Sequence, residues 1–195
     1  LHVMGTLESL PADEAHLWVM RPDAIHDPKL LAAYEGLLTD EERARRDRFA
    51  FAEGKRESLL TRALVRTTLS RYIPVEPHAW RFSAGDHGKP FVRSPGDFPW
   101  LSFNLSHTKG LIACLVCRGR DVGVDVEDVQ RRGQTVEIAE RFFAADEVKA
   151  LRALPTDEQR ARFFVYWTLK EAYIKARGLG LAIPLGQFAF LLEPK

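Results

Sequence analysis

Residues 121–127 alternate strictly between valine and acidic or small residues, a pattern that restricts this segment to an extended strand. The three valines would then share the face that meets the core. Gly123, Asp125 and Glu127 would share the opposite face, with the two carboxylates about 7 Å apart along the backbone. The alternation therefore predicts a strand over residues 122–129 that carries two acids on one side.

Two interpretations of these acids stay open from the residues alone. Carboxylates of like charge need a counter-ion to lie together, and a hard cation such as Mg²⁺ suits oxygen ligands. Gly123 would leave room beside Asp125 and Glu127 for a close ligand. The other interpretation is a solvated edge strand whose polar residues simply face water.

The remaining periodicity predicts an α+β protein of two halves that join near residues 118–121. We expect helices over residues 39–51, 53–72, 135–143, 146–154 and 157–177. We expect strands over residues 80–82, 91–92, 100–105, 111–117, 122–129 and 184–192. An interface between two such halves is the usual place for a ligand site.

The helix expected over residues 157–177 places Trp167, Glu171 and Lys175 on one face, at positions i, i+4 and i+8. One interpretation is an ordinary helical ion pair between Glu171 and Lys175. The other is the wall of a cleft, in which Glu171 is a third metal ligand or a general base and Lys175 neutralises a phosphate.

Composition excludes several classes of protein. The 195 residues include 28 Lys or Arg and 27 Asp or Glu, and a net charge of +1 argues against a surface built for nucleic acid. No apolar run reaches the roughly 20 residues that span a bilayer. Two cysteines are too few for a disulfide scaffold, which points to a reducing, cytoplasmic compartment. Cys114 and Cys117 lie in an apolar run and are expected as buried thiols on opposite faces of a strand.

One segment departs from the balanced total charge. Residues 43–66 contain eight Lys or Arg and three acids. This excess suits contact with phosphates, an acidic protein or RNA, but a solvated helix face explains it equally well.

Five short motifs occur in order along the chain, and together they carry a family resemblance. They are Gly88-Lys89-Pro90, residues 103–108 (Phe-Asn-Leu-Ser-His-Thr), residues 123–127 (Gly-Val-Asp-Val-Glu), residues 141–143 (Arg-Phe-Phe), and residues 167–172 (Trp-Thr-Leu-Lys-Glu-Ala) with Lys175. In this order the sequence resembles the 4′-phosphopantetheinyl transferases of the two-half type that activates peptide and polyketide synthases.

The resemblance implies a fold of two pseudo-equivalent α+β halves with the active site in the cleft between them. The halves would be residues 1–119, with the coenzyme A and carrier contacts, and residues 120–195, with the metal-binding carboxylates. It also implies the reaction, in which the 4′-phosphopantetheine arm of coenzyme A moves to a serine of an acyl or peptidyl carrier protein. Adenosine 3′,5′-bisphosphate is released.

Site residues follow from the same resemblance. The implied metal ligands, for Mg²⁺ or else Mn²⁺, are Asp125, Glu127 and Glu171. The implied catalytic residues are Asp125, Glu171 as the base and Lys175 on the pyrophosphate. The implied coenzyme A contacts are Arg45, Ser58, Lys89, Ser106, His107 and Lys175. A cation of the family is replaced here by Glu42.

The resemblance further implies a monomer that binds neither nucleic acid nor membrane. Two other functions stay open from the residues: a module that binds RNA or an acidic protein through residues 43–66, and a metal-dependent phosphoester hydrolase that uses the same carboxylates.

Overall fold

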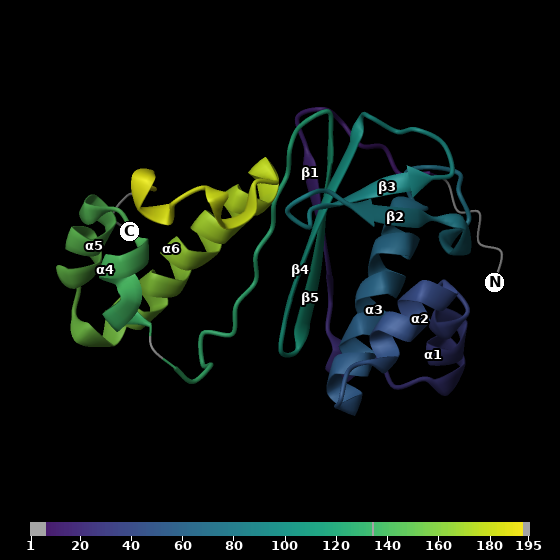
Figure 1. Cartoon of the computed structure of the whole chain (residues 1–195), viewed down its shortest axis with the longest axis horizontal. Coiled ribbons are helices and arrows are strands. Elements are labelled where there is room, and N and C mark those ends of the chain that lie inside the picture. The colour runs from purple at the N-terminus through teal and green to yellow at the C-terminus, as the bar shows by residue number, and fades with distance from the viewer. Residues whose placement is uncertain (1–6, 134, 193–195) are drawn as a thin grey trace.

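The computed structural model describes residues 7–133 and 135–192, and it combines helices with strands, as the sequence predicts (Figure 1). The strands are β1 (Ala15–Met20), β2 (Arg81–Ala84), β3 (Pro90–Ser94), β4 (Leu101–Thr108) and β5 (Leu111–Arg118). The helices are α1 (Pro28–Glu35), α2 (Asp40–Asp47), α3 (Ala52–Leu69), α4 (Ala139–Phe142), α5 (Ala145–Arg152) and α6 (Thr156–Arg177). Short 3₁₀ turns are η1 (Pro22–Ala24), η2 (Pro77–Ala79), η3 (Val136–Ile138), η4 (Gly180–Ala182) and η5 (Leu185–Gln187). Strand β1 and helix α1 are elements that the sequence analysis does not anticipate.

The first half is built on an antiparallel sheet in the order β1-β5-β4, with β2 and β3 as a separate hairpin. Helix α3 covers one face of this sheet, where Leu60 and Val65 join Ile112, Cys114 and Val116 in the core. Because side chains alternate along a strand, the other face of β4 is left to carry polar residues. That face is the one available to the second half of the chain.

The two cysteines are buried free thiols on opposite faces of β5, as predicted. Cys114 lies on the α3 side, and burial raises the pKa of its thiol to about 12. A thiol that stays protonated is a poor nucleophile, so Cys114 is a packing residue.

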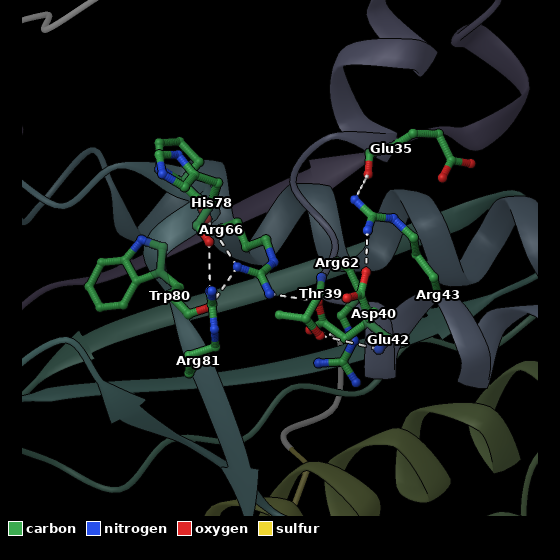
Figure 2. A network of polar contacts seen from close by, with 11 residues as sticks. Glu35, Thr39, Asp40, Glu42, Arg43, Arg62, Arg66, His78, Trp80 and Arg81 are labelled. Carbon is green, nitrogen blue, oxygen red and sulfur yellow. Dashed lines mark hydrogen bonds and ion pairs between the residues drawn. The ribbon is translucent and has the colours of Figure 1, made fainter.

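A buried ion pair fastens α2 to α3 (Figure 2). The Arg66 guanidinium is fully buried, donates to the carbonyl of Trp80 at 2.7 Å and pairs with Glu42 at 2.6 Å. Glu42 also completes the capping box of α2 with Thr39. Glu42 therefore has a structural role, as both helix cap and buried counter-ion.

The second half packs its own core around α6, with Phe143, Leu151, Phe163 and Tyr166 among the buried side chains. Figure 1 shows α4 to α6 on one side of the molecule, with the C-terminal end of α6 running back to the sheet. Within the two described ranges, no helix has both the length and the apolar character needed to cross a membrane.

Two predicted strands are wrong. Residues 122–128 have no regular secondary structure and Val129 begins a turn, whereas residues 184–192 contain η5 followed by chain without regular structure. In both segments, side chains from other elements form the hydrogen bonds with the backbone that a neighbouring strand would otherwise form. The N–H groups of Val124 and Val126 donate to Asn104 and Ser106 of β4. A backbone satisfied in this way has no need of a partner strand.

Candidate active site

A pocket of about 260 Å³ lies where β4 and the loop before β3 meet the C-terminal part of α6. Its walls combine residues from the two halves of the chain, as an interface site would. The lining residues are His87, Gly88, Lys89, Pro90, Asn104, Leu105, Glu171, Ile174, Lys175, Gly178 and Gly180. Lys89, Glu171 and Lys175 are thus the predicted site residues that the structure places directly on the pocket wall.

Lys89 joins the halves at one end of this pocket. Its ammonium donates to the carbonyl of Ala176 at 2.6 Å and to the carboxylate of Asp121 at 3.0 Å. Gly178 ends α6 in the left-handed region at φ 63°, and the Lys89 side chain passes against it. A left-handed C-cap favours glycine, so the turn after α6 also makes room for this lysine.

Gly123 has a different role from the one predicted. A Cβ at this position would overlap the carbonyl oxygen of Ala172 and the backbone nitrogen of Ala176. The space beside Gly123 is therefore filled by the backbone of α6 and is not free for a ligand. This close approach brings Asp125, two residues later, against the same helix.

Asp125 is the centre of a polar cluster between the halves. Its side chain is 8% exposed, and its Oδ1 atom accepts from Lys175 at 2.6 Å and from the Ser106 hydroxyl at 3.0 Å. Lys175 therefore contacts Asp125 and, across the two halves, Ser106 at 2.9 Å, and the interpretation as an ordinary helical ion pair with Glu171 is not needed to explain it. The Oδ2 atom of Asp125 is buried and has no hydrogen-bond partner.

The charges of this cluster change the pKa of Glu171. Burial and the negative charge of Asp125 raise the pKa of Glu171 above its ordinary value, with a smaller contribution from Glu127, while Lys175 opposes the shift. A carboxylate with a raised pKa binds a proton more readily than an ordinary glutamate does. The structure thus supplies a reason for Glu171 to act as a base.

The raised pKa predicts that Glu171 costs stability at neutral pH. The unfolded chain ionises this carboxyl near pH 4.3, about its ordinary pKa, whereas the folded protein keeps the proton to higher pH. Stability therefore falls as pH rises through that window, and the cost persists above it. Glu171→Gln should raise the melting temperature at pH 7, and this gain should vanish below about pH 4.

Thermal unfolding followed by circular dichroism in EDTA, from acid to neutral pH, measures this difference. The matched control is Glu76→Gln, which removes an exposed carboxylate far from the cluster. A Glu171→Gln variant with no gain in melting temperature at neutral pH contradicts the prediction.

The donor set fits a hard divalent cation in part. Asp125 and Glu171 offer carboxylate oxygens, and the unpartnered Oδ2 of Asp125 is the kind of buried acceptor that a cation would satisfy. Glu127 instead faces Arg131, at 3.5 Å. Across the described part of the chain, no three His, Cys, Asp or Glu side chains are grouped so as to hold one metal ion.

Three predicted coenzyme A contacts lie away from the pocket. His107 follows Ser106 on β4, so it projects to the α3 face, where its imidazole lies against the Glu57 carboxylate. Ser58 is half-buried on α3. Arg45 is 63% exposed on α2 and pairs with Glu41 at 3.5 Å. Other basic residues of the segment 43–66 form internal contacts, since Arg46 pairs with Glu35 and both Arg62 and the fully buried Arg66 pair with Glu42, so much of the basic excess is neutralised within the first half.

Two residues that line the pocket, Asn104 and His87, are not predicted from the sequence, and Trp167, which is predicted as a wall of the cleft, lies elsewhere. Asn104 is buried on β4 and accepts from the Val124 N–H at 3.0 Å. The sequence feature that could have identified it is a single amide side chain within an otherwise apolar strand. His87 sits on a turn, packed against Gly180, and carried no signal. Trp167 stacks on Phe163 inside the second core, so it is not a wall of the cleft.

Comparisons with known proteins agree on one family. Residues 121–195 match the model of the 4′-phosphopantetheinyl transferase superfamily, and residues 27–118 match that of the 4′-phosphopantetheinyl transferase N-terminal domain. The chain is 37% identical to the 4′-phosphopantetheinyl transferase HetI of Nostoc sp. strain PCC 7120, over 89% of this chain and 73% of HetI. It is 33% identical to Sfp of Bacillus subtilis strain 168, over 82% of this chain and 69% of Sfp. A phosphopantetheinyl transferase of Thraustochytrium sp. is 33% identical over 94% of this chain and 67% of its own length.

Proposed function

The chain belongs to the 4′-phosphopantetheinyl transferase superfamily and is an enzyme that transfers 4′-phosphopantetheine to carrier proteins, and from this premise we propose that coenzyme A is its donor and that Mg²⁺ supports the reaction. Mn²⁺ is the alternative metal. The observation that carries the proposal is the cluster of Asp125, Glu171 and Lys175 at the junction of the halves. The carboxylates of Asp125 and Glu171, with Oδ2 of Asp125 unpaired, suit a cation. The ammonium group of Lys175 beside them suits the negative charge of a diphosphate.

We assign the chemistry to residues of this cluster. Asp125 and Glu171 would hold the cation, and Glu127 would join them if it leaves Arg131. The cation would offset the charge that builds on the diphosphate oxygens and orient the leaving group. Lys175 and Lys89, which both line the pocket, would receive the negative charge of the diphosphate.

The transfer step needs one bond formed, one bond broken and one proton moved. The carrier serine oxygen bonds to the phosphorus that bears pantetheine, and the bond from that phosphorus to the bridging oxygen breaks. Adenosine 3′,5′-bisphosphate leaves with that oxygen. We propose that the Glu171 carboxylate takes the serine proton, directly or through a water, because it lines the pocket beside Lys175.

We further propose a division of labour within one chain. Residues 1–119 would contribute coenzyme A and carrier contacts, and residues 120–195 would contribute the carboxylates. The pocket already draws on both parts, which supports a monomeric enzyme. The buried free thiols Cys114 and Cys117 suit a reducing compartment and support a cytoplasmic location.

The direct test is to incubate the protein with coenzyme A, Mg²⁺ and several apo carrier proteins of fatty-acid, polyketide and peptide synthases. We expect at least one carrier to gain the mass of one phosphopantetheinyl group. EDTA should stop the gain in mass, and added Mg²⁺ or Mn²⁺ should restore it, because the proposed reaction needs a divalent cation held by Asp125 and Glu171.

Two results would count against the proposal. Transfer that continues in EDTA would remove the metal from it. Phosphopantetheine released from coenzyme A without any carrier, and with no carrier modified, would favour a hydrolase. The family match already argues against a module that only binds RNA or an acidic protein.

A further inference from the structure

The turn between β2 and β3 is closed by hydrogen bonds of its own backbone. The Gly88 N–H donates to the carbonyl of Gly85 at 2.8 Å, and the Gly85 N–H donates to the carbonyl of Lys89 at 3.0 Å. Gly88 itself has a φ of 83°, in the left-handed region that favours glycine. The turn therefore has a defined shape, and it carries His87 and Lys89 immediately before and after Gly88.

Two glycines that follow α6 receive these two side chains. Gly178 and Gly180 both have left-handed backbones, with φ values of 63° and 54°. A Cβ at Gly178 would lie 3.0 Å from Cδ of Lys89. A Cβ at Gly180 would lie 3.3 Å from Cβ of His87 and 3.6 Å from Nδ1 of its ring. The spacing of two residues between the side chains on the turn thus matches the spacing of the glycines that receive them.

The two contacts join opposite halves of the chain beside the pocket. His87, Lys89, Gly178 and Gly180 all line the pocket, together with residues of α6. The Lys89 ammonium donates to the carbonyl of Ala176, at the negative end of the α6 dipole. Lys89 therefore supplies one fixed point between the turn and α6. The contact of His87 with Gly180 supplies a second point, which restricts rotation about the first.

We propose that His87 and Gly180 form a clasp that holds the β2–β3 turn against the loop after α6, and that His87 is thereby a positioning residue for coenzyme A. The clasp sets the separation between the wall from the first half and the wall from α6. Gly180 is then more than a turn residue, because the side chain that it lacks leaves the space that His87 occupies. The inference rests on the proposed function in so far as the pocket receives coenzyme A.

A double-mutant cycle tests the clasp. Gly180→Ala adds a methyl group against His87, and His87→Gly removes the side chain that this methyl group would meet. Coenzyme A affinity is measured by calorimetry with Mg²⁺, and the melting temperature by circular dichroism. Each single variant should bind coenzyme A more weakly. The product of the two single losses should exceed the loss in the double variant by about 10-fold, a usual coupling between residues in contact.

Gly119→Ala is the matched control for backbone strain. Gly119 has a φ of 65°, close to that of Gly180, and a Cβ there would meet no atom of the described residues within 4 Å. Gly119→Ala should lower the melting temperature but leave coenzyme A affinity unchanged, because it strains the backbone without touching the pocket. If Gly180→Ala does not fold, Gly180→Asn adds bulk against His87 with a residue that tolerates the left-handed region.

Three results overturn the inference. The first is that the single losses of affinity simply multiply in the double variant. The second is a loss of affinity in Gly180→Ala no larger than that in Gly119→Ala. The third is coupling between His87→Gly and Gly180→Ala in the melting temperature alone, with coenzyme A affinity unchanged in both, which would make the contact purely structural.

Failure of the proposed function looks different. In that case coenzyme A binds and its affinity shows the coupling between His87 and Gly180, but no carrier protein is modified.

Discussion

Asp125→Asn should lower kcat/KM for carrier modification about 100- to 1,000-fold, the usual effect of removing one well-placed electrostatic group from a reaction centre. Asparagine has nearly the same size and keeps an oxygen that accepts from Ser106, so the fold should survive. What it removes is the negative charge that faces Lys175 and attracts a cation. Lys175 would then stay without its counter-ion, at 2.6 Å from a neutral amide in place of a carboxylate.

The rate of mass gain by a carrier, followed at limiting and saturating coenzyme A, measures this effect. Circular dichroism shows whether the variant is folded. Asp157→Asn is the matched control, since it makes the same change of charge on an exposed residue in the first turn of α6. A folded Asp125→Asn protein with activity close to wild type would refute the assignment of Asp125 to the reaction centre.

Lys170→Met should reduce the free energy of unfolding by about 3–5 kcal/mol, because it leaves a buried carboxylate without its partner. Lys170 and Glu147 are 0% and 1% exposed, and their charged atoms lie 2.7 Å apart. The lysine also donates to the carbonyls of Leu185 and Phe188, at 2.7 and 2.6 Å. One side chain therefore fastens the segment that follows η5 onto α5 and α6.

Urea unfolding monitored by tryptophan fluorescence measures the loss. Lys149→Met, which removes an exposed lysine of α5, should change stability little. Combining Lys170→Met with Glu147→Gln should recover part of the loss, since the orphaned charge is then removed. A loss no larger than that of Lys149→Met would show that the pair adds nothing to stability.

Lys170 and Glu171 are adjacent in sequence but have opposite environments. Lys170 points into the second core, and Glu171 lines the pocket. Neighbouring residues on a helix face directions about 100° apart, so fixing Lys170 in the core also fixes the direction of Glu171. A loss of stability in Lys170→Met should therefore be accompanied by a loss of activity, even though Lys170 touches no reacting group.

Local patterns were sufficient where one element satisfies its own backbone. The helix expected from residue 39 begins as α2 at Asp40, the helix expected to end at residue 177 ends as α6 at Arg177, and the strand expected over residues 111–117 is β5. These boundaries depend on neighbours a few residues away, which the sequence contains explicitly. Lys89, Glu171 and Lys175, which the family resemblance implies as site residues, line the pocket.

Errors arose where the backbone is satisfied by side chains from distant elements. Residues 121–127 form no strand, and Asn104 and Ser106 accept from the N–H groups of this segment that a partner strand would have used. In the segment that ends near Phe190, Lys170 donates to the carbonyl of Leu185 and Glu147 accepts from the N–H of Phe190. A local sequence pattern does not show which distant side chain will bind the backbone, so these segments are predicted as strands.

The sequence by itself determined the α+β class, the position of the main helices and the identity of the charged residues at the junction of the halves. Only the tertiary structure decided that Lys175 faces Asp125, that Ser106 and His107 point to opposite faces of β4, and that Gly123 receives a helix. The physical reason is the range of the forces involved: helix and strand preferences act between near neighbours. The partner of a buried charge is chosen by which side chains meet once the two cores have packed.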